Sequence, residues 1–289
     1  MYNNPYIIHP LSLSSSFSFS YCSHGWLKNS TGDITGAQPC DLYIKSTTPT
    51  SNTSTIFLWP LPINISNGNT LITVSPNFNF VATTPSSDLT NAFDRIQKLI
   101  FNHNLPTNSK NIANNPTLTT LNVNVANVNV PLQLGVDESY SLVILADGSA
   151  ATLTANTVYG AYHGLQTFSQ LIQWSPDNKQ YQCPITPIVI SDAPRFAWRG
   201  LLIDTDRHFQ SLSTIYTIID SLSYNKMNTL HWHIVDAQAW PVESAAYPLL
   251  WAAAWSYTER YTFEDVAMVI EYARQRGVRV VLEFDTVSI

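Results

Sequence analysis

The chain has 289 residues, of which 45% are hydrophobic and only 12% are charged. Its formal net charge is −6 with 14 Lys and Arg residues, so it cannot build the basic face that a nucleic-acid-binding protein needs. No run of about 18 apolar residues occurs, which excludes a transmembrane helix. The charges are uneven, because 18 of them lie in the last 91 residues. This asymmetry predicts two units, with the polar chemistry concentrated in the second.

The first 54 residues show no pattern typical of a folded domain. The chain starts without the positive charge and the apolar run that a signal peptide needs. Residues 12–20 are rich in Ser and Phe. We therefore expect residues 1–54 to be a disordered leader without an assigned role.

The three cysteines leave the redox state open. Cys22 and Cys40 could form a disulfide in an oxidising compartment, and with Cys183 they could equally be three free thiols. Their spacing does not match a metal site, and we predict neither a metal nor a cofactor. Asn-X-Ser/Thr triplets, which accept glycans in secreted proteins, begin at Asn29, Asn52 and Asn64. In a chain rich in Asn, Ser and Thr, such triplets favour secretion only weakly.

Residues 55–190 alternate between strand and helix patterns. The alternation of apolar and polar residues slips at Ala126-Asn127, which indicates a bulge or a turn, and Asp147-Gly148 predicts a hairpin. The expected strands are Thr55–Pro62, Thr70–Val74, Leu121–Val125, Ser141–Ala146, Ala151–Ala155 and Pro187–Ser191; the expected helices are Asp88–Phe101 and Thr157–Gln173. This order predicts an α+β domain, with helices on one antiparallel sheet. His163 in the second helix is expected to be a packed or surface histidine.

From Arg195 the pattern changes to strand, helix, strand, helix, strand. The strands are expected at Gly200–Asp204, Asn228–Asp236 and Val278–Asp285, as apolar runs that a parallel sheet buries on both faces. Ser213 is expected to cap the first helix. Thr262-Phe-Glu-Asp265 resembles a capping box for the second helix, which should stop at Gly277. We expect a parallel sheet built of βαβ units.

Polar residues recur after each of these three strands. They are Asp204, Asp206, Arg207 and His208, then Asp236, then Glu283 and Asp285. Because the carboxyl ends of parallel strands share one edge, these residues are expected to meet there and form a site. Trp232 and His233 are neighbours on one strand and point to opposite faces, and we interpret both as packing residues.

Several long motifs resemble one enzyme family. They are Pro194–Phe209, Tyr224–Asn228, His231–Asp236, Val269–Arg279 and Glu283–Thr286, preceded by Leu58–Pro62, Asp137–Tyr140 and Tyr159–Ser169. In this order they resemble β-N-acetylhexosaminidases of the lysosomal type, the retaining, substrate-assisted glycoside hydrolase family 20. The resemblance implies a domain at 55–194 and the start of a catalytic TIM (β/α)₈ barrel at 195–289, about its first three strands.

The resemblance also implies a reaction and the residues that bind its substrate. The family hydrolyses terminal N-acetylglucosamine or N-acetylgalactosamine from a glycoconjugate, and the substrate's own acetamido oxygen attacks the anomeric carbon. An Asp orients the acetamido group and a Glu protonates the leaving oxygen. Arg207 matches the family's sugar-binding arginine, Asp236 matches an acidic residue of the same pocket, and Asp285 matches an acidic residue that supports the site.

The catalytic Asp-Glu pair of the family has no counterpart in this chain. The family's third-strand motif continues with Pro-Gly-His, whereas this chain has Val287-Ser-Ile289. The only adjacent acids in the second unit, Glu264-Asp265, are expected to begin a helix. We therefore predict a portion of a hexosaminidase, from truncation or an altered reading frame, that has no activity alone.

Two other functions stay open at this stage. One is a non-catalytic amino-sugar-binding or partner protein that keeps Arg207 and Asp236. The other is an unrelated α/β enzyme that shares barrel patterning. The family resemblance implies a lysosomal or secreted location, and a homodimer where the full barrel exists.

Overall fold

The computed structural model describes residues 57–103 and 115–286, so Cys22, Cys40, Asn29 and Asn52 lie outside the described residues. Its first part contains β1 (Asn64–Ala82), α1 (Ser87–Ile100), β2 (Thr117–Asn127), β3 (Tyr140–Ile144), β4 (Ala151–Thr157), α2 (Val158–Leu171), β5 (Gln173–Ser175) and β6 (Gln180–Asp192). Its second part contains β7 (Gly200–Asp204), α3 (Leu212–Tyr224), β8 (Thr229–Val235), the 3₁₀ helix η1 (Pro248–Ala253), α4 (Phe263–Arg274) and β9 (Arg279–Phe284). Residues 57–62 form no strand, so the expectation of a strand there is wrong.

The first sheet is mixed rather than antiparallel, which corrects the prediction. Its order is β1-β2-β4-β3-β6-β5, and β1 also pairs with β6. The β1–β2 and β2–β4 pairs are parallel, and the other pairs are antiparallel. The connection from β1 to β2 passes through α1, and such a crossover returns the chain in the same direction. Only β3 and β4 form the expected hairpin, whose turn contains Gly148 at φ +66°.

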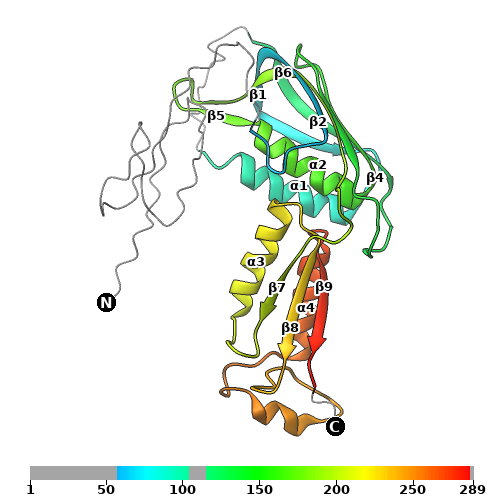
Figure 1. Cartoon of the computed structure of the whole chain (residues 1–289). Coiled ribbons are helices and arrows are strands. Elements are labelled where there is room, and N and C mark those ends of the chain that lie inside the picture. Colours follow the sequence, from blue (N-terminus) through cyan, green and yellow to red (C-terminus); the bar gives the residue numbers. More distant parts are fainter. Residues whose placement is uncertain (1–56, 104–114, 287–289) are drawn as a thin grey trace, which may run out of the picture. The chain divides into compact units, whose positions relative to one another are not determined.

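The helices α1 and α2 lie on one face of this sheet (Figure 1). The face is apolar because every second residue of β2 points to it, with Leu121 and Val123 fully buried. The expected phase slip is a turn at residues 128–129. Almost all of α2 is buried, including Leu165 and Phe168, and the Thr157 side chain caps its first turn by accepting a hydrogen bond from Gly160 N. The helix predicted at Thr157–Gln173 is thus confirmed.

The second sheet has the predicted parallel βαβαβ arrangement. Its order is β7-β8-β9, and both pairs are parallel. Residues from the helices α3 and α4 form one hydrophobic core with alternate residues of β8: Ile215, Ile219, Leu222, Leu230, Trp232, Ile234, Val269 and Ala273. Burial on both faces is confirmed only for the central strand, because Leu201 and Leu202 of the edge strand β7 are 46% and 50% exposed.

The caps of α3 and α4 can be compared residue by residue with the predicted ones. Ser211, not Ser213, caps α3, because its Oγ accepts from the backbone N of Thr214 at 3.3 Å. Thr262 and Asp265 form the expected capping box at α4. Gly277 adopts φ +73° just after this helix, as the predicted stop requires.

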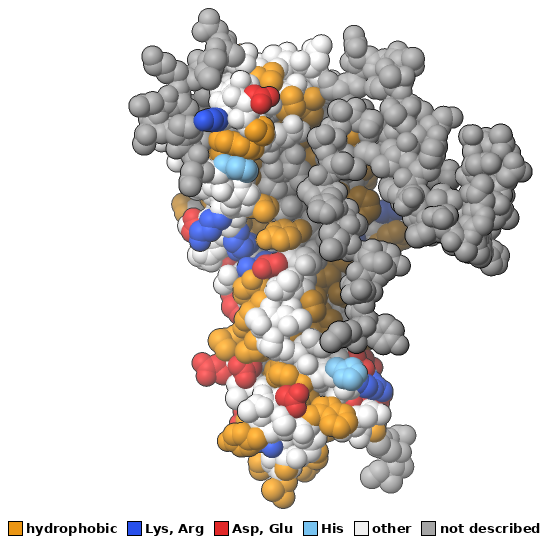
Figure 2. Space-filling view, turned by 90° about the vertical axis from the view of Figure 1, so that its left-hand side faces the viewer, with side chains coloured by type: hydrophobic (Ala, Val, Ile, Leu, Met, Phe, Trp, Pro, Cys, Tyr) orange, Lys and Arg blue, Asp and Glu red, His pale blue; other side chains and the backbone are white. Residues whose placement is uncertain are grey.

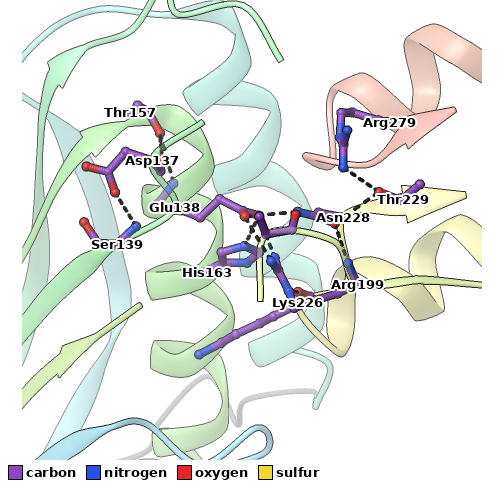
Figure 3. A network of polar contacts seen from close by, with 12 residues as sticks. Asp137, Glu138, Ser139, Thr157, His163, Arg199, Lys226, Asn228, Thr229 and Arg279 are labelled. Carbon is purple, nitrogen blue, oxygen red and sulfur yellow. Dashed lines mark hydrogen bonds and ion pairs between the residues drawn. The ribbon is translucent and has the colours of Figure 1, made fainter. Parts of the chain in front are cut away.

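A buried polar network joins residues of the two sheet systems (Figure 3). Glu138 accepts hydrogen bonds from Arg199 Nη2 at 2.7 Å and Asn228 Nδ2 at 3.1 Å, and it contacts His163 Nε2 at 3.0 Å. Burial raises the pKa of Glu138, but the contacts with His163 and Arg199 outweigh it and lower the pKa to about 2. His163 is 5% exposed, so the interpretation as a packed histidine is confirmed.

Charged side chains of both signs are mixed with hydrophobic ones on the face drawn in Figure 2. Among the described helices, none is both long and apolar enough to cross a membrane. Cys183 is a buried free thiol, and burial raises its pKa to about 11.

Candidate sugar-binding site

The polar residues predicted to meet follow the ends of three paired parallel strands. In the sheet, Asp204 of β7 pairs with His233 of β8, and His233 pairs with Glu283 of β9. Asp236 and Asp285 come directly after β8 and β9, and the Asp285 backbone N donates to Val235 O at 2.9 Å. The carboxyl ends of the strands thus lie at one edge, as expected.

Arg207 is held by the turn that follows β7. The Oδ1 atom of Asp204 accepts from the backbone N of Asp206 and of Arg207, each at 3.1 Å. Asp side chains commonly stabilise turns by such hydrogen bonds to backbone N–H groups a few residues further along the chain. It directs the guanidinium of Arg207 back onto the strand end, where Nη1 donates to Asp204 Oδ2 at 2.8 Å.

A second carboxylate reaches the same guanidinium from β8. Arg207 Nη2 lies 2.5 Å from Asp236 Oδ2, and Arg207 Nε lies 3.9 Å from Asp206 Oδ2. Arg207 keeps 42% of its side chain exposed, so the side chain is in part accessible to solvent. The structure therefore brings together Arg207 and Asp236, which the family resemblance places in the same pocket.

Within this cluster, Asp204 and Arg207 each stabilise the charged form of the other. Burial raises the pKa of Asp204, but hydrogen bonds from the Arg207 backbone and guanidinium outweigh it and hold the pKa below its ordinary value. The hydrogen bond with Asp204 raises the pKa of Arg207. Both groups thus stay charged over a wide pH range.

His233 belongs to this cluster, so its interpretation as a packing residue is wrong. Its Nδ1 lies 3.2 Å from Arg207 Nη1, and its Nε2 lies 3.4 Å from Asp236 Oδ2. Ligand atoms of His233, Asp236 and Asp285 lie within 4.8 Å of one another, so Asp285 also joins the group. Trp232 points to the opposite face, is fully buried and donates from Nε1 to Thr205 Oγ1, which confirms it as a packing residue. The period of two along β8 separates His233 from Trp232, and the pairing of His233 with Asp204 of β7 places His233 on the site face.

The other predicted residues make their closest contacts elsewhere or are exposed. Glu283 pairs with His231 at 2.7 Å, and His208 is exposed. Asp206 is fully buried and accepts from Ala239 N at 2.7 Å, so it holds the loop after β8. Asp265 serves the helix cap, as expected.

The arrangement is suited to hydrogen bonding with a polyhydroxylated ligand. The forked guanidinium can donate to two neighbouring hydroxyl groups, while the carboxylates can accept from hydroxyls. The donor set of His233, Asp236 and Asp285 could by composition hold a cation, but Arg207 already neutralises Asp236.

Comparisons with known proteins show which family and fold the chain resembles. Residues 196–288 match the model of the glycosyl hydrolase family 20 catalytic domain, and residues 58–171 match that of a "beta acetyl hexosaminidase like" domain. The chain is 43% identical over 231 residues to beta-hexosaminidase subunit B1 of Dictyostelium discoideum, covering 79% of this chain and 40% of that protein. It is 39% identical over 247 residues to beta-hexosaminidase subunit beta of Sus scrofa, covering 82% and 46%.

A solved structure shows the same fold. The chitobiase of Flavobacterium johnsoniae superposes with a TM-score of 0.66 at 34% identity, over 79% of this chain and 34% of that one. The chain thus spans less than half the length of these relatives. With both family models matched in order, the chain belongs to glycosyl hydrolase family 20, the glycosidase family of the β-hexosaminidases.

Proposed function

We propose that this chain carries part of the machinery of a β-N-acetylhexosaminidase, which removes terminal N-acetylglucosamine or N-acetylgalactosamine with retention. The observation that supports it most is the contact between Arg207 and Asp236 at the ends of two parallel strands. In this proposal Arg207 binds hydroxyls of the terminal sugar and Asp236 orders the pocket. Asp285 supports the pocket from the third strand.

The fold supports a division of the chain into two domains. We propose that residues 55–194 form the domain that precedes the catalytic one, and that residues 195–289 form the first three strands of a TIM barrel, with residues 1–54 as a leader. Support comes from the parallel β7-β8-β9 sheet with α3 and α4 packed against it. A complete (β/α)₈ barrel typically has about 250 residues, so residues 195–289 would form only part of one.

The chemistry of the reaction requires two groups that this chain does not supply. A protonated Glu must give its proton to the leaving oxygen, and an ionised Asp must stabilise the acetamido group as positive charge develops on it. Adjacent Asp and Glu occur at Asp137-Glu138, where Glu138 is buried against Arg199 and His163. Glu138, with its pKa of about 2, cannot be the proton donor.

We therefore expect the purified 289-residue chain to show no turnover of a chromogenic β-N-acetylglucosaminide. Arg207→Ala is the variant that tests the site, and Arg195→Ala is its matched control, because Arg195 is exposed and lies over the Phe196 ring. Turnover that Arg207→Ala abolishes and Arg195→Ala retains would contradict the predicted inactivity.

A second candidate is a non-catalytic amino-sugar-binding protein, favoured by the partial exposure of the Arg207 side chain. Calorimetry with N-acetylglucosamine separates this candidate from an inert portion of the enzyme that binds no sugar. Saturable binding without turnover, lost in Arg207→Ala only, would favour this candidate. A glycoconjugate substrate, a lysosomal or secreted location and a homodimer belong to the proposal for the whole enzyme.

A further inference from the structure

Each ring nitrogen of His233 lies close to a charged side chain. Arg207 Nη1 lies 3.2 Å from Nδ1, and Asp236 Oδ2 lies 3.4 Å from Nε2. The residue is 8% exposed, and Nε2 is buried without a hydrogen bond from or to any described residue. Two further carboxylates lie near the ring: Asp204 Oδ2 is 3.9 Å from Nδ1, and an Asp285 oxygen is within 4.8 Å of a ring nitrogen.

The contact with Arg207 determines where the ring proton lies. A guanidinium has only donors, so Nδ1 must accept from Arg207 and therefore carries no proton. In a neutral imidazole the proton is then on Nε2. This places an N–H donor on the side of Asp236, at a distance that a small movement shortens to a hydrogen bond.

The same reasoning argues against a cation among His233, Asp236 and Asp285. A metal ion would take the lone pair of Nε2 and move the ring proton to Nδ1. That proton would point at the N–H group of Arg207, and the ion would lie close to the guanidinium that already pairs with Asp236. The contacts thus favour a hydrogen-bond donor at Nε2 over a metal ligand.

We propose that His233 is a positioning residue, in the neutral Nε2–H form, which holds Arg207 and Asp236 in their mutual geometry. It accepts from Arg207 on one side and donates toward Asp236 on the other, so the three residues form a closed ring of contacts. Arg207 Nη1 is shared between His233 and Asp204, which restricts rotation of the fork. The role rests on the proposed function, because a fixed fork matters only if Arg207 binds a sugar.

The form of the ring is measurable on the full chain without any sugar. Long-range ¹H–¹⁵N NMR of ¹⁵N-histidine-labelled chain at neutral pH should show the Nε2–H pattern for one signal that is absent in His233→Gln. That pattern should shift in Arg207→Ala and stay unchanged in His208→Gln, since His208 is exposed. A charged ring, an Nδ1–H pattern, or a signal indifferent to Arg207→Ala would overturn the proposal.

A second measurement tests whether His233 restricts the rotation of the Arg207 guanidinium. Asn at position 233 keeps an acceptor near Nδ1, whereas Leu removes it. The ¹⁵N signals of the Arg207 fork should show hindered rotation in the wild type and in His233→Asn, and averaged rotation in His233→Leu. Equal rotation in all three would refute the positioning role, as would Zn²⁺ titration that shifts Nε2 at one equivalent. Absence of sugar binding by the ordered wild-type chain would instead count against the proposed function.

Discussion

At the residue scale, Glu138 shows how one carboxylate can join two sheets. It is 7% exposed, and it contacts donors from α2 and from the segments before β7 and β8 (Figure 3). A charge buried to this degree is tolerated only when donors surround it. Without Glu138, Arg199 and Asn228 would each lose a buried acceptor.

The substitution Glu138→Gln is therefore expected to destabilise the chain. The amide keeps the size of the side chain but leaves Arg199 without its opposite charge, so the free energy of unfolding should fall by about 3 kcal/mol. Urea unfolding followed by circular dichroism measures it. Glu264→Gln is the control, because Glu264 is exposed and should change stability by less than about 0.5 kcal/mol. Equal effects of the two substitutions would show that the Glu138 network contributes nothing.

At the element scale, the start of α3 depends on one of two neighbouring serines. Ser211 Oγ accepts from Thr214 N, whereas Ser213 Oγ only contacts Ser211 Oγ at 2.8 Å. Ser211→Ala should lower the unfolding free energy by about 1 kcal/mol, because an N-cap bond is lost. Ser213→Ala, equally exposed, should cost less than half as much. Thermal unfolding of the two variants compares them, and a larger loss for Ser213→Ala would place the cap where the sequence pattern first placed it.

How far the sequence predicted these elements depends on how local their causes are. The capping box at Thr262 and the stop at Gly277 act within one helical turn, and both were predicted. The mixed first sheet was not, because pairing direction depends on contacts far apart in the chain, such as Thr73 with Thr117. Residues 57–62 have strand-like composition but find no partner strand.

The candidate site was predicted in part for the same reason. Arg207 and Asp236 follow strands whose parallel order the sequence indicated, so their meeting could be expected. His233 was missed because a histidine within an apolar strand looks like a packing residue. Only the register of β8 against β7, which pairs it with Asp204, reveals the face that it shares with Arg207.

At the scale of the whole molecule, stability should fall in acid. The pKa of Glu138 is about 2 in the fold against 4.5 in an exposed Glu, so the folded state binds fewer protons than the unfolded one. Its contribution is complete above pH 4.5 and is lost as pH falls from there through about 2. Burial also lowers the pKa of His163, which adds a loss that begins below pH 6.5.

Urea midpoints measured from about pH 8 down to pH 3 test this expectation. The wild type should lose stability in two stages, below pH 6.5 and more steeply below pH 4.5, while the second stage should be shallower in Glu138→Gln. High salt distinguishes buried from surface charges. The pKa of Glu271 is also lowered to about 2, by its hydrogen bonds with Arg274, but Glu271 is 52% exposed. Salt at about 1 M should therefore screen the charge of Glu271 and leave that of Glu138 largely unscreened. Parallel acid profiles for wild type and Glu138→Gln in high salt would mean that surface carboxylates, not the buried network, govern acid unfolding.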